Sequence, residues 1–326
     1  MTRIDSSPAR RAGPVPGTRA GGMRLALVTS VISGVAIYTN GHAVRRFDGS
    51  AAFTTAKNLV AALVLGGMLA LLTARRSPGG WTPPAGRSAR LGLVAVGVVG
   101  GSVPFLLFFE GLSRAASSDA AFIHKTLVMW VALLAAAVLR ERVGWAHVAA
   151  IGALVAGQAL LSGGPGGPAG LAAGSGEVLV LAATLLWSVE VVVAKRLLGD
   201  LSPLTVGAAR MGLGAVVLVA WLAVTGRLGD LAAYGAAQWG WVVLTGLLLT
   251  GYVATWFAAL ARAGAVDVTA VLVLGAVVTA ALSGALDGVP LRPDLPGLAL
   301  VTVGVGLVAR RARGRPAAAP APVPGR

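Results

Sequence analysis

The stretch 112–119, Leu-Ser-Arg-Ala-Ala-Ser-Ser-Asp, returns 148 residues later at 260–267 as Leu-Ala-Arg-Ala-Gly-Ala-Val-Asp. Phe109 and Phe257 precede the two copies in the same register. Apolar helices often resemble one another, but an Arg and an Asp that recur in register in uncharged surroundings are seldom a coincidence. Weak internal symmetry of this kind indicates a chain built from two related units.

Long apolar runs fill almost all of the chain between its two ends. Hydrophobic residues make up 56% of the sequence, charged residues 12%, and the mean hydropathy is +0.81; a soluble domain carries roughly twice that charged fraction. Crossing a membrane takes about 20 apolar residues, and backbone amides in lipid must be paired internally. The sequence therefore predicts an all-α integral membrane protein with ten transmembrane helices, at approximately 25–44, 52–73, 91–112, 119–138, 145–161, 178–198, 204–225, 238–260, 266–286 and 294–309.

Basic residues are distributed unevenly between the two sides of these spans. With both termini cytoplasmic, the cytoplasmic segments hold 19 Lys and Arg, the outer loops hold 5, and the spans hold 3. This positive-inside bias fits an even number of crossings and predicts a multi-pass protein of the cytoplasmic (inner) membrane. Because the basic residues form short clusters between apolar runs, the net charge of +15 does not indicate a nucleic-acid partner.

Polar segments divide the chain into five parts. Residues 1–24 and 310–326, rich in Arg and Pro, are expected to be disordered basic cytoplasmic tails. The first five-helix unit is expected over 25–161, a Gly/Pro-rich linker over 162–175, and the second five-helix unit over 176–309. Because each unit crosses the membrane five times, the second lies inverted relative to the first. Inverted repeats are typical of transporters, which bind their solute near the bilayer midplane where the repeats meet.

Four short motifs carry a resemblance to a known family: Leu139-Arg140-Glu141-Arg142-Val143, Gly176-Glu177, Trp187-Ser188 and Arg210. With them the chain resembles the EamA-type transporters of the drug/metabolite transporter superfamily, which typically have Leu-Gly-Glu-Arg-Leu at the first motif. The resemblance covers residues 24–309. It implies two five-helix units, alternating access and a small metabolite or drug-like substrate.

The chain also departs from the family pattern. Lys57 takes the position of the usual Arg in the first unit, and Val289 replaces the usual Glu in the second. His124 and Lys125 stand where the fourth helix commonly has a small residue or Pro. Because of these differences, the resemblance does not identify the substrate.

Glu190 and Arg210 are ionisable groups inside adjacent, antiparallel spans. Each lies roughly 12 Å from the cytoplasmic end of its span at 1.5 Å per residue, so we expect an ion pair. The pair has two interpretations. It neutralises two buried charges, or Glu190 binds a proton or a cationic group of the solute with Arg210 as its counter-ion.

Four further candidates lie toward the outer side: Lys57, Glu110, His124 and Lys125. Lys57 and Arg210 occupy equivalent positions in the two units, so inversion is expected to place them near opposite mouths of the pathway. Glu110 is expected to pair with Lys57 or Lys125, although Lys57 also has the option of snorkelling to the headgroups. His124 and Lys125 project about 100° apart on a helix, so only one is expected to face a narrow cavity. If that residue is Lys125, the site favours anionic or zwitterionic solutes.

Signatures of other functions are missing from the sequence. It has no Cys and three His, and it lacks a His-Glu-x-x-His motif, a Gly-x-Ser-x-Gly elbow and a phosphate-binding loop. We therefore expect no metal, no cofactor, no catalytic residue and no ATP hydrolysis by this chain. The function expected is secondary transport of a small molecule by alternating access, with proton coupling, exchange or facilitated diffusion left open. A polytopic membrane enzyme or a channel is the alternative, and pairing into a homodimer is left open.

Overall fold

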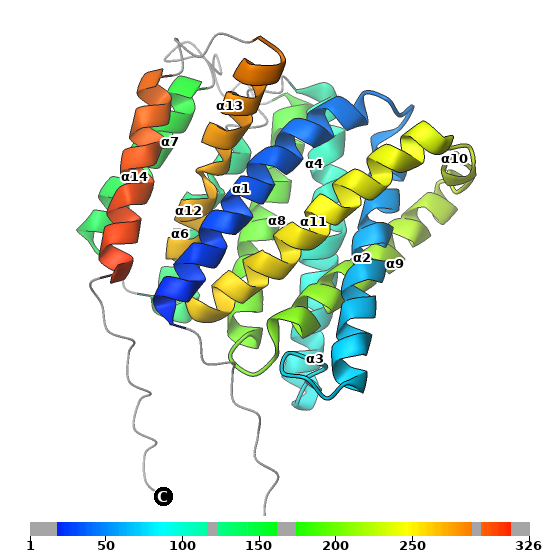
Figure 1. Cartoon of the computed structure of the whole chain (residues 1–326), viewed down its shortest axis with the longest axis horizontal. Coiled ribbons are helices and arrows are strands. Elements are labelled where there is room, and N and C mark those ends of the chain that lie inside the picture. Colours follow the sequence, from blue (N-terminus) through cyan, green and yellow to red (C-terminus); the bar gives the residue numbers. More distant parts are fainter. Residues whose placement is uncertain (1–17, 116–122, 142, 162–173, 289–294, 314–326) are drawn as a thin grey trace, which may run out of the picture.

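The computed structural model describes residues 18–115, 123–141, 143–161, 174–288 and 295–313, and every regular element in these ranges is a helix (Figure 1). The first unit contains α1 (Arg19–Val44), α2 (Ser50–Ala74), α3 (Gly86–Ala95), the π-helix η1 (Val96–Gly100), α4 (Val103–Arg114), α6 (Leu127–Leu139) and α7 (Trp145–Leu161). The second contains α8 (Ser175–Leu197), α9 (Pro203–Val224), α10 (Gly229–Ala232), α11 (Ala236–Arg262), α12 (Ala265–Leu272), α13 (Gly275–Leu286) and α14 (Leu295–Arg313).

Seven helices or helix runs in the described residues are long and apolar enough to cross a membrane. They are Arg19–Val44, Ser50–Ala74, Gly86–Gly111, Ser175–Leu197, Pro203–Val224, Ala236–Arg262 and Ala265–Leu286. The shorter apolar helices Ile123–Val138, His147–Gly157 and Leu295–Gly304 occupy the places of the fourth, fifth and tenth predicted spans. The all-helical membrane fold is confirmed, and the count of ten crossings stays a prediction.

The ends of the first and last helices differ from the sequence prediction. Helix α1 begins at Arg19 rather than residue 25, because the Thr18 hydroxyl caps it by accepting a hydrogen bond from the Gly21 amide. Helix α14 continues to Arg313 rather than ending at residue 309. The remainder of the predicted tails (1–17 and 314–326) and most of the predicted linker (162–173) lie outside the described residues.

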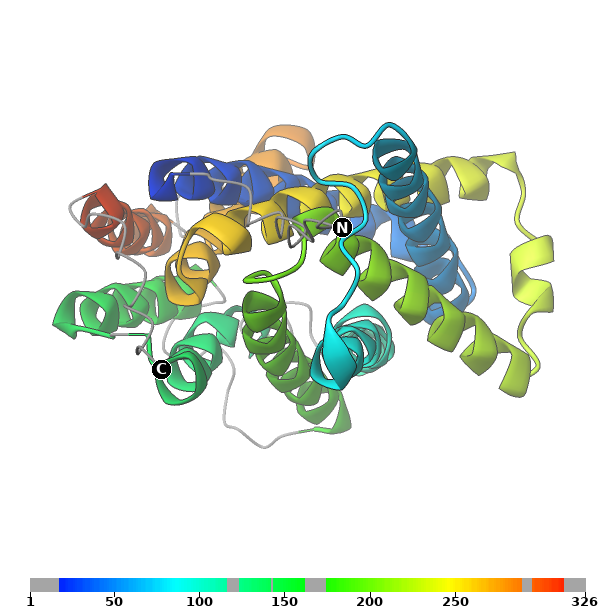
Figure 2. The same cartoon turned by 90° about the horizontal axis from the view of Figure 1, so that it is seen from below.

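The helices of the two units pack against each other rather than forming two separate bundles. Helix α1 lies against α11, α12 and α13, α2 against α9 and α11, and α7 against α14. Seen end-on, α1, α11 and α2 form one side of the molecule, and α7, α6 and α8 form the other (Figure 2). Helices α2 and α9, the second helices of their units, run in opposite directions (Figure 1). One continuous core combines Leu65 and Val131 with Met211 and Phe257, so each unit contributes to the packing of the other.

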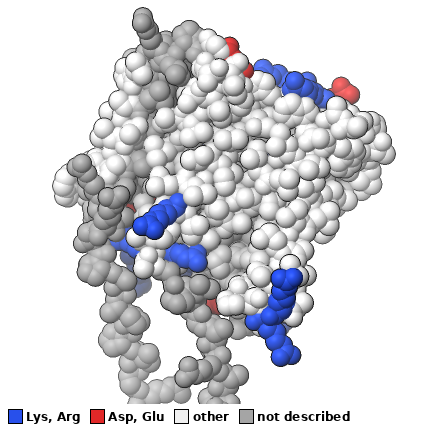
Figure 3. Space-filling view, in the orientation of Figure 1, with Lys and Arg blue, Asp and Glu red and all other residues white. Residues whose placement is uncertain are grey.

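The outer surface of the bundle suits a lipid environment. A broad band without Lys, Arg, Asp or Glu crosses the face in Figure 3, with basic residues below it and charged residues along the upper edge. Large apolar side chains are exposed on several helices, including Leu27 and Val31 on α1, Leu63 on α2 and Val216 on α9. An apolar surface of this extent is unfavourable in water and matches the hydrocarbon core of a bilayer.

Two arginines follow helices in the left-handed backbone region that favours glycine. Arg140 ends α6 with φ +55°, and Arg76 lies just beyond α2 with φ +51°. Arg140 stands at the position where the family motif has Gly. A side chain in this region brings Cβ close to the carbonyl oxygen, which costs roughly 1–2 kcal/mol.

Replacing Arg140 with Gly should therefore raise the free energy of unfolding by about 1 kcal/mol, measured by thermal unfolding in detergent. Arg75→Gly is the matched control, because exposed Arg75 ends α2 with an ordinary φ of −80°. There glycine should bring no gain. Equal shifts in both variants would contradict the backbone argument.

Candidate functional site

A cavity of about 460 Å³ lies inside the bundle and is lined by residues of both units. The first unit contributes parts of α1, α2 and α4 and residues near the start of α6, and the second contributes parts of α8, α9, α11, α12 and α13. Cavities of roughly 300–1,000 Å³ are typical of small-molecule sites. Five of the six candidate residues line this cavity: Lys57, His124, Lys125, Glu190 and Arg210.

Glu190 and Arg210 form the expected ion pair. The Arg210 side chain donates from Nε to Glu190 Oε1 at 2.7 Å and from Nη2 to Oε2 at 3.2 Å, so both carboxylate oxygens accept. The two side chains are only 3% and 6% exposed. Because a planar guanidinium matches a carboxylate in this two-pronged geometry, each charge is neutralised at the cavity wall.

The main chain opposite Glu190 is shaped by Pro104. Proline has no amide hydrogen, so the carbonyl of Gly100, four residues earlier, lacks its usual helical donor. That carbonyl accepts instead from Trp187 Nε1 at 3.1 Å, at the end of the π-helix η1. A Cβ added at Gly100 would lie 2.3 Å from the Glu190 carboxyl carbon. Gly100 therefore makes room for the ion pair at the end of a π-helix, a form often found at functional sites.

Lys57 and Arg210 do not lie near opposite mouths, so that prediction is wrong. Each is the eighth residue of its helix, and both approach the ring of Phe105: Lys57 Nζ lies 6.0 Å from its centroid and Arg210 Cζ 5.5 Å. Two long side chains, each about two turns into an inverted helix, meet in the middle of the bundle. Lys57 is buried and donates to Asn40 Oδ1 at 3.1 Å, so it does not snorkel.

His124 and Lys125 both line the cavity, which corrects the expectation that only one would face it. The cavity is wide enough to accept two side chains that diverge from adjacent positions. The helical path is also interrupted here, because residues 123–125 are followed by a turn at Thr126 before α6 begins. Lys125 has no hydrogen-bond or ion-pair partner within the described ranges.

Glu110 lies outside this cavity, and its expected pairing with Lys57 or Lys125 is wrong. Its side chain is 48% exposed and forms an ion pair with Arg114, one turn further along α4. Both residues line a second hollow between α2, α4 and α9. The short i,i+4 spacing lets Arg114 reach Glu110 without any tertiary contact. Glu110 therefore pairs within its own helix rather than with Lys57 or Lys125.

Aromatic rings cover much of the cavity wall. Phe108, His124 and Trp187 contact one another with ring centroids 5.0–5.5 Å apart, and Phe105 adds an edge contact to Trp187 at 5.4 Å. On α11, Tyr252 and Trp256 stack with their planes 9° apart. Phe105, Phe108 and Tyr252 are not predicted from the sequence, because scattered aromatic residues in apolar helices carry no local signal of a cavity.

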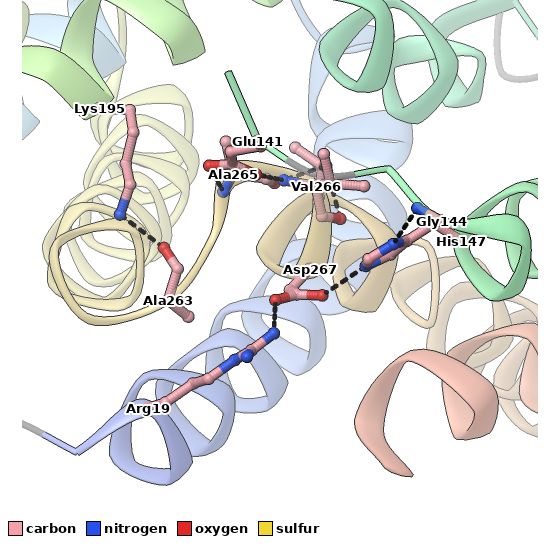
Figure 4. Close-up of polar contacts among 10 residues, drawn as sticks. Arg19, Glu141, Gly144, His147, Lys195, Ala263, Ala265, Val266 and Asp267 are labelled. Atoms are coloured by element: carbon pink, nitrogen blue, oxygen red, sulfur yellow. Dashed lines mark hydrogen bonds and ion pairs between the residues drawn. The ribbon is translucent and has the colours of Figure 1, made fainter. Parts of the chain in front are cut away.

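A second polar group, which we call the corner cluster, surrounds the turn between α11 and α12: Arg19, Glu141, His147, Lys195 and Asp267 (Figure 4). Lys195 Nζ donates to the carbonyls of Leu260 and Ala263 at the end of α11. The Glu141 carboxylate accepts from the amides of Ala265 and Val266 at the start of α12. The unpaired backbone groups of two helix ends are thereby satisfied by side chains from α8 and from the segment that follows α6.

Asp267 is the charged centre of the corner cluster. Its carboxylate accepts from Arg19 of α1, and its other oxygen lies 3.2 Å from His147 Nε2 of α7. The Gly144 amide approaches His147 Nδ1 at 3.4 Å, which favours the tautomer with its proton on Nε2, facing Asp267. Asp267 and His147 are almost fully buried. Asp267 thus ties α1 and α7 to the start of α12.

The corner cluster was missed at the sequence level, although two of its members stood in recognised patterns. Asp267 marks the internal repeat, and Glu141 is the acid of the first family motif; neither pattern indicates a contact between them. Asp119, the repeat counterpart of Asp267, and Val289, the counterpart of Glu141, lie outside the described residues. Among the residues that are described, no three His, Cys, Asp or Glu side chains gather as a metal site would require.

Comparisons with known proteins agree with the helical arrangement. The model of the EamA-like transporter family matches the chain twice, over residues 20–163 and 174–310. A solved structure titled only as the crystal structure of a protein is similar over 91% of this chain and 99% of its own, with 19% sequence identity and a TM-score of 0.70. At that identity the likeness shows the fold alone. The comparison with curated proteins gave no match.

The buried ion pair generates the first prediction for this site. Glu190→Gln or Arg210→Met alone should lower the free energy of unfolding by about 3–5 kcal/mol, because each leaves an unpaired buried charge. The double variant should lose less than the sum of the two single losses. Additive losses, measured by thermal unfolding in detergent, would show that the two charges do not stabilise each other.

Gly100→Ala should lower the free energy of unfolding by about 1–3 kcal/mol, because the new methyl group displaces the Glu190 carboxylate. Gly67→Ala, on an exposed part of α2 with no atom within 4 Å of the added Cβ, is the control. It should be neutral or stabilising by up to about 1 kcal/mol, since alanine is the better helix former. The idea fails if both variants change stability in the same direction.

Proposed function

The chain belongs to the EamA-like transporter family, and from this premise we propose that it is a secondary transporter that moves a small metabolite or drug-like solute across the cytoplasmic membrane. In this proposal ten helices cross the bilayer with both termini in the cytoplasm, and the solute is carried by alternating access. The observation that carries the proposal is the cavity, which both units line and into which intramembrane charges project. Ionisable groups in such positions mark solute pathways by default.

The corner cluster supports a closed gate at one end of the cavity. Lys195 lies five residues beyond Glu190 on α8, and the start of α12 lies seven residues before Leu272, which lines the cavity. These separations correspond to roughly 8–10 Å along a helix. The corner cluster therefore lies about two turns below the cavity, at the end where α1 begins (Figure 1). The predicted topology makes this the cytoplasmic end.

The contacts of the corner cluster suit a gate that must also open. These contacts are made at helix ends and between side chains, and water can hydrogen-bond to the same polar groups once the helices separate. Separation of α1 and α7 from the start of α12 would release Asp267 from Arg19 and His147 together. In the alternating-access scheme this movement opens the cavity to the cytoplasm while the opposite end of the cavity closes.

Transport itself is tested by reconstituting the purified full chain in liposomes and offering pools of small organic solutes, with protein-free liposomes as the control. We expect at least one solute to accumulate or exchange only where the protein is present. If no solute moves, the transporter proposal is wrong. A flux that follows an imposed pH gradient identifies proton coupling, and a flux that requires solute on both sides identifies exchange.

Alternating access is tested by locking the corner. A Cβ placed at Gly22 of α1 would lie 3.0 Å from Cβ of Ala263 and 2.9 Å from Cβ of Arg262, so α1 and the end of α11 must move slightly apart to reach the 3.5–4.5 Å of a disulfide. The chain has no cysteine of its own. Oxidised Gly22→Cys/Ala263→Cys should lose at least about nine-tenths of its flux, because a disulfide cannot open thermally. A reductant should restore the flux of the same sample.

Gly22→Cys alone is the matched control and should not respond to oxidation. Unchanged flux in the oxidised double variant, with the disulfide verified, would contradict a gate at this corner. That outcome leaves the flux measurement in wild-type liposomes as a separate test of transport.

A further inference from the structure

The charges on the cavity wall do not balance. Its ionisable side chains are Lys57, Lys125, Glu190 and Arg210, together with His124. Glu190 is its only acid among the described residues, and Arg210 already occupies both oxygens of that carboxylate. The pair is neutral overall, so among the described residues the wall carries two positive charges, those of Lys57 and Lys125, without an acid to compensate them.

The two lysines differ in how far their charges are satisfied. Lys57 Nζ donates to Asn40 and lies 4.4 Å from the ring centroid of Phe109, and such a ring face partly compensates a cation. Lys125, which has no polar partner in the described ranges, is partly exposed to the cavity. An unpaired cation in a bilayer is costly, so a negatively charged ligand gains more here than a neutral ligand of the same shape.

The same cavity offers aromatic surface beside the positive charge. His124, next to Lys125 in the chain, belongs to the ring cluster with Phe108 and Trp187. His124 meets both rings edge to face, and the planes of Phe108 and Trp187 are tilted by 54°. These arrangements leave further edges and faces for another ring. Among the hydroxyl groups of the wall, those of Thr245 and Thr279 donate to backbone carbonyls, and Ser33 and Tyr252 add two further hydroxyls. Positive charge and aromatic surface are the features that distinguish this wall.

Taking these features together, we propose that the solute of this cavity is an organic anion that carries an aromatic ring, with Lys125 as the main counter-charge and the Phe108–His124–Trp187 cluster as the ring site. The inference rests on the proposed transport function and names the substrate class of that same site. A cationic solute would meet two positive charges. The ammonium group of a zwitterion would find Glu190, the acid that lines the cavity among the described residues, already paired with Arg210. A volume of about 460 Å³ suits one or two rings.

The test is equilibrium binding to the purified full chain in detergent or nanodiscs, measured by calorimetry. Five probes of nearly equal size separate charge from aromaticity: 3-phenylpropanoate, 3-cyclohexylpropanoate, 3-phenylpropanamide, 3-phenylpropylamine and phenylalanine. The aromatic anion should bind at least about tenfold more tightly than the amide, the amine and the zwitterion. Among these four probes, it alone offers Lys125 a negative charge that no positive group of the probe compensates. The aromatic anion should bind at least about threefold more tightly than the cyclohexyl anion, which lacks the ring quadrupole.

Variants assign the effect to the proposed residue. Lys125→Met should weaken binding of 3-phenylpropanoate about tenfold or more, and Lys125→Arg, which keeps the charge, should retain most of the affinity. Arg45→Met removes one positive charge from an exposed position outside the cavity and should bind like the wild type. Thermal unfolding of each variant shows that it is folded.

Three outcomes overturn the proposal: none of the probes binds, the amide, amine or zwitterion binds as tightly as the aromatic anion, or folded Lys125→Met binds 3-phenylpropanoate like the wild type. Equal binding of the cyclohexyl anion overturns the aromatic part alone. Each of these is separate from failure of the proposed function, which would appear as the absence of any solute flux in wild-type liposomes.

Discussion

An opposite pair of charges held away from water constrains everything around it. Glu190 and Arg210 are stable inside a bilayer only while each satisfies the other, so their neighbours must keep them in register. Gly100 leaves the space that the carboxylate fills, and Pro104 frees the carbonyl that Trp187 binds. The cavity has its position because helices of both units converge on this pair.

The Glu190–Arg210 pair and the corner cluster have different mechanical consequences. The Glu190–Arg210 pair is buried beside the cavity and costs much to separate. The corner cluster instead binds the ends of α11 and α12, where Lys195 and Glu141 replace water on carbonyls and amides. Such groups are readily rehydrated, so in the proposed alternating access the corner end of the bundle is expected to separate while the buried pair stays together. A carrier with one fixed site requires such a division.

Sequence reasoning succeeded where a property is local or periodic. Apolar runs predicted the positions of the helices, and the repeat indicated two units. The similar depth of Glu190 and Arg210 in adjacent helices predicted their ion pair. It failed where the answer depends on which helices face each other. Glu110 forms its ion pair with Arg114, one turn away on the same helix. Lys57 and Arg210 both lie near Phe105, because long side chains from inverted helices reach the same midplane. The tertiary contacts of the corner cluster join residues 65 to 248 positions apart, and no spacing rule encodes such contacts.

The interleaving of the units also governs how the protein is made. Helix α1 ends at Val44, but α11, against which it packs, begins at Ala236. At about 5–20 residues per second, synthesis takes roughly 10–40 s to cover that interval. During this time the polar groups of α1 that contact α11, such as the Thr29 hydroxyl that meets Thr255, have not met their final neighbours. The early helices must therefore be sheltered by the insertion machinery or by one another, and a chain that stops after its first unit has half a cavity and no core to close it.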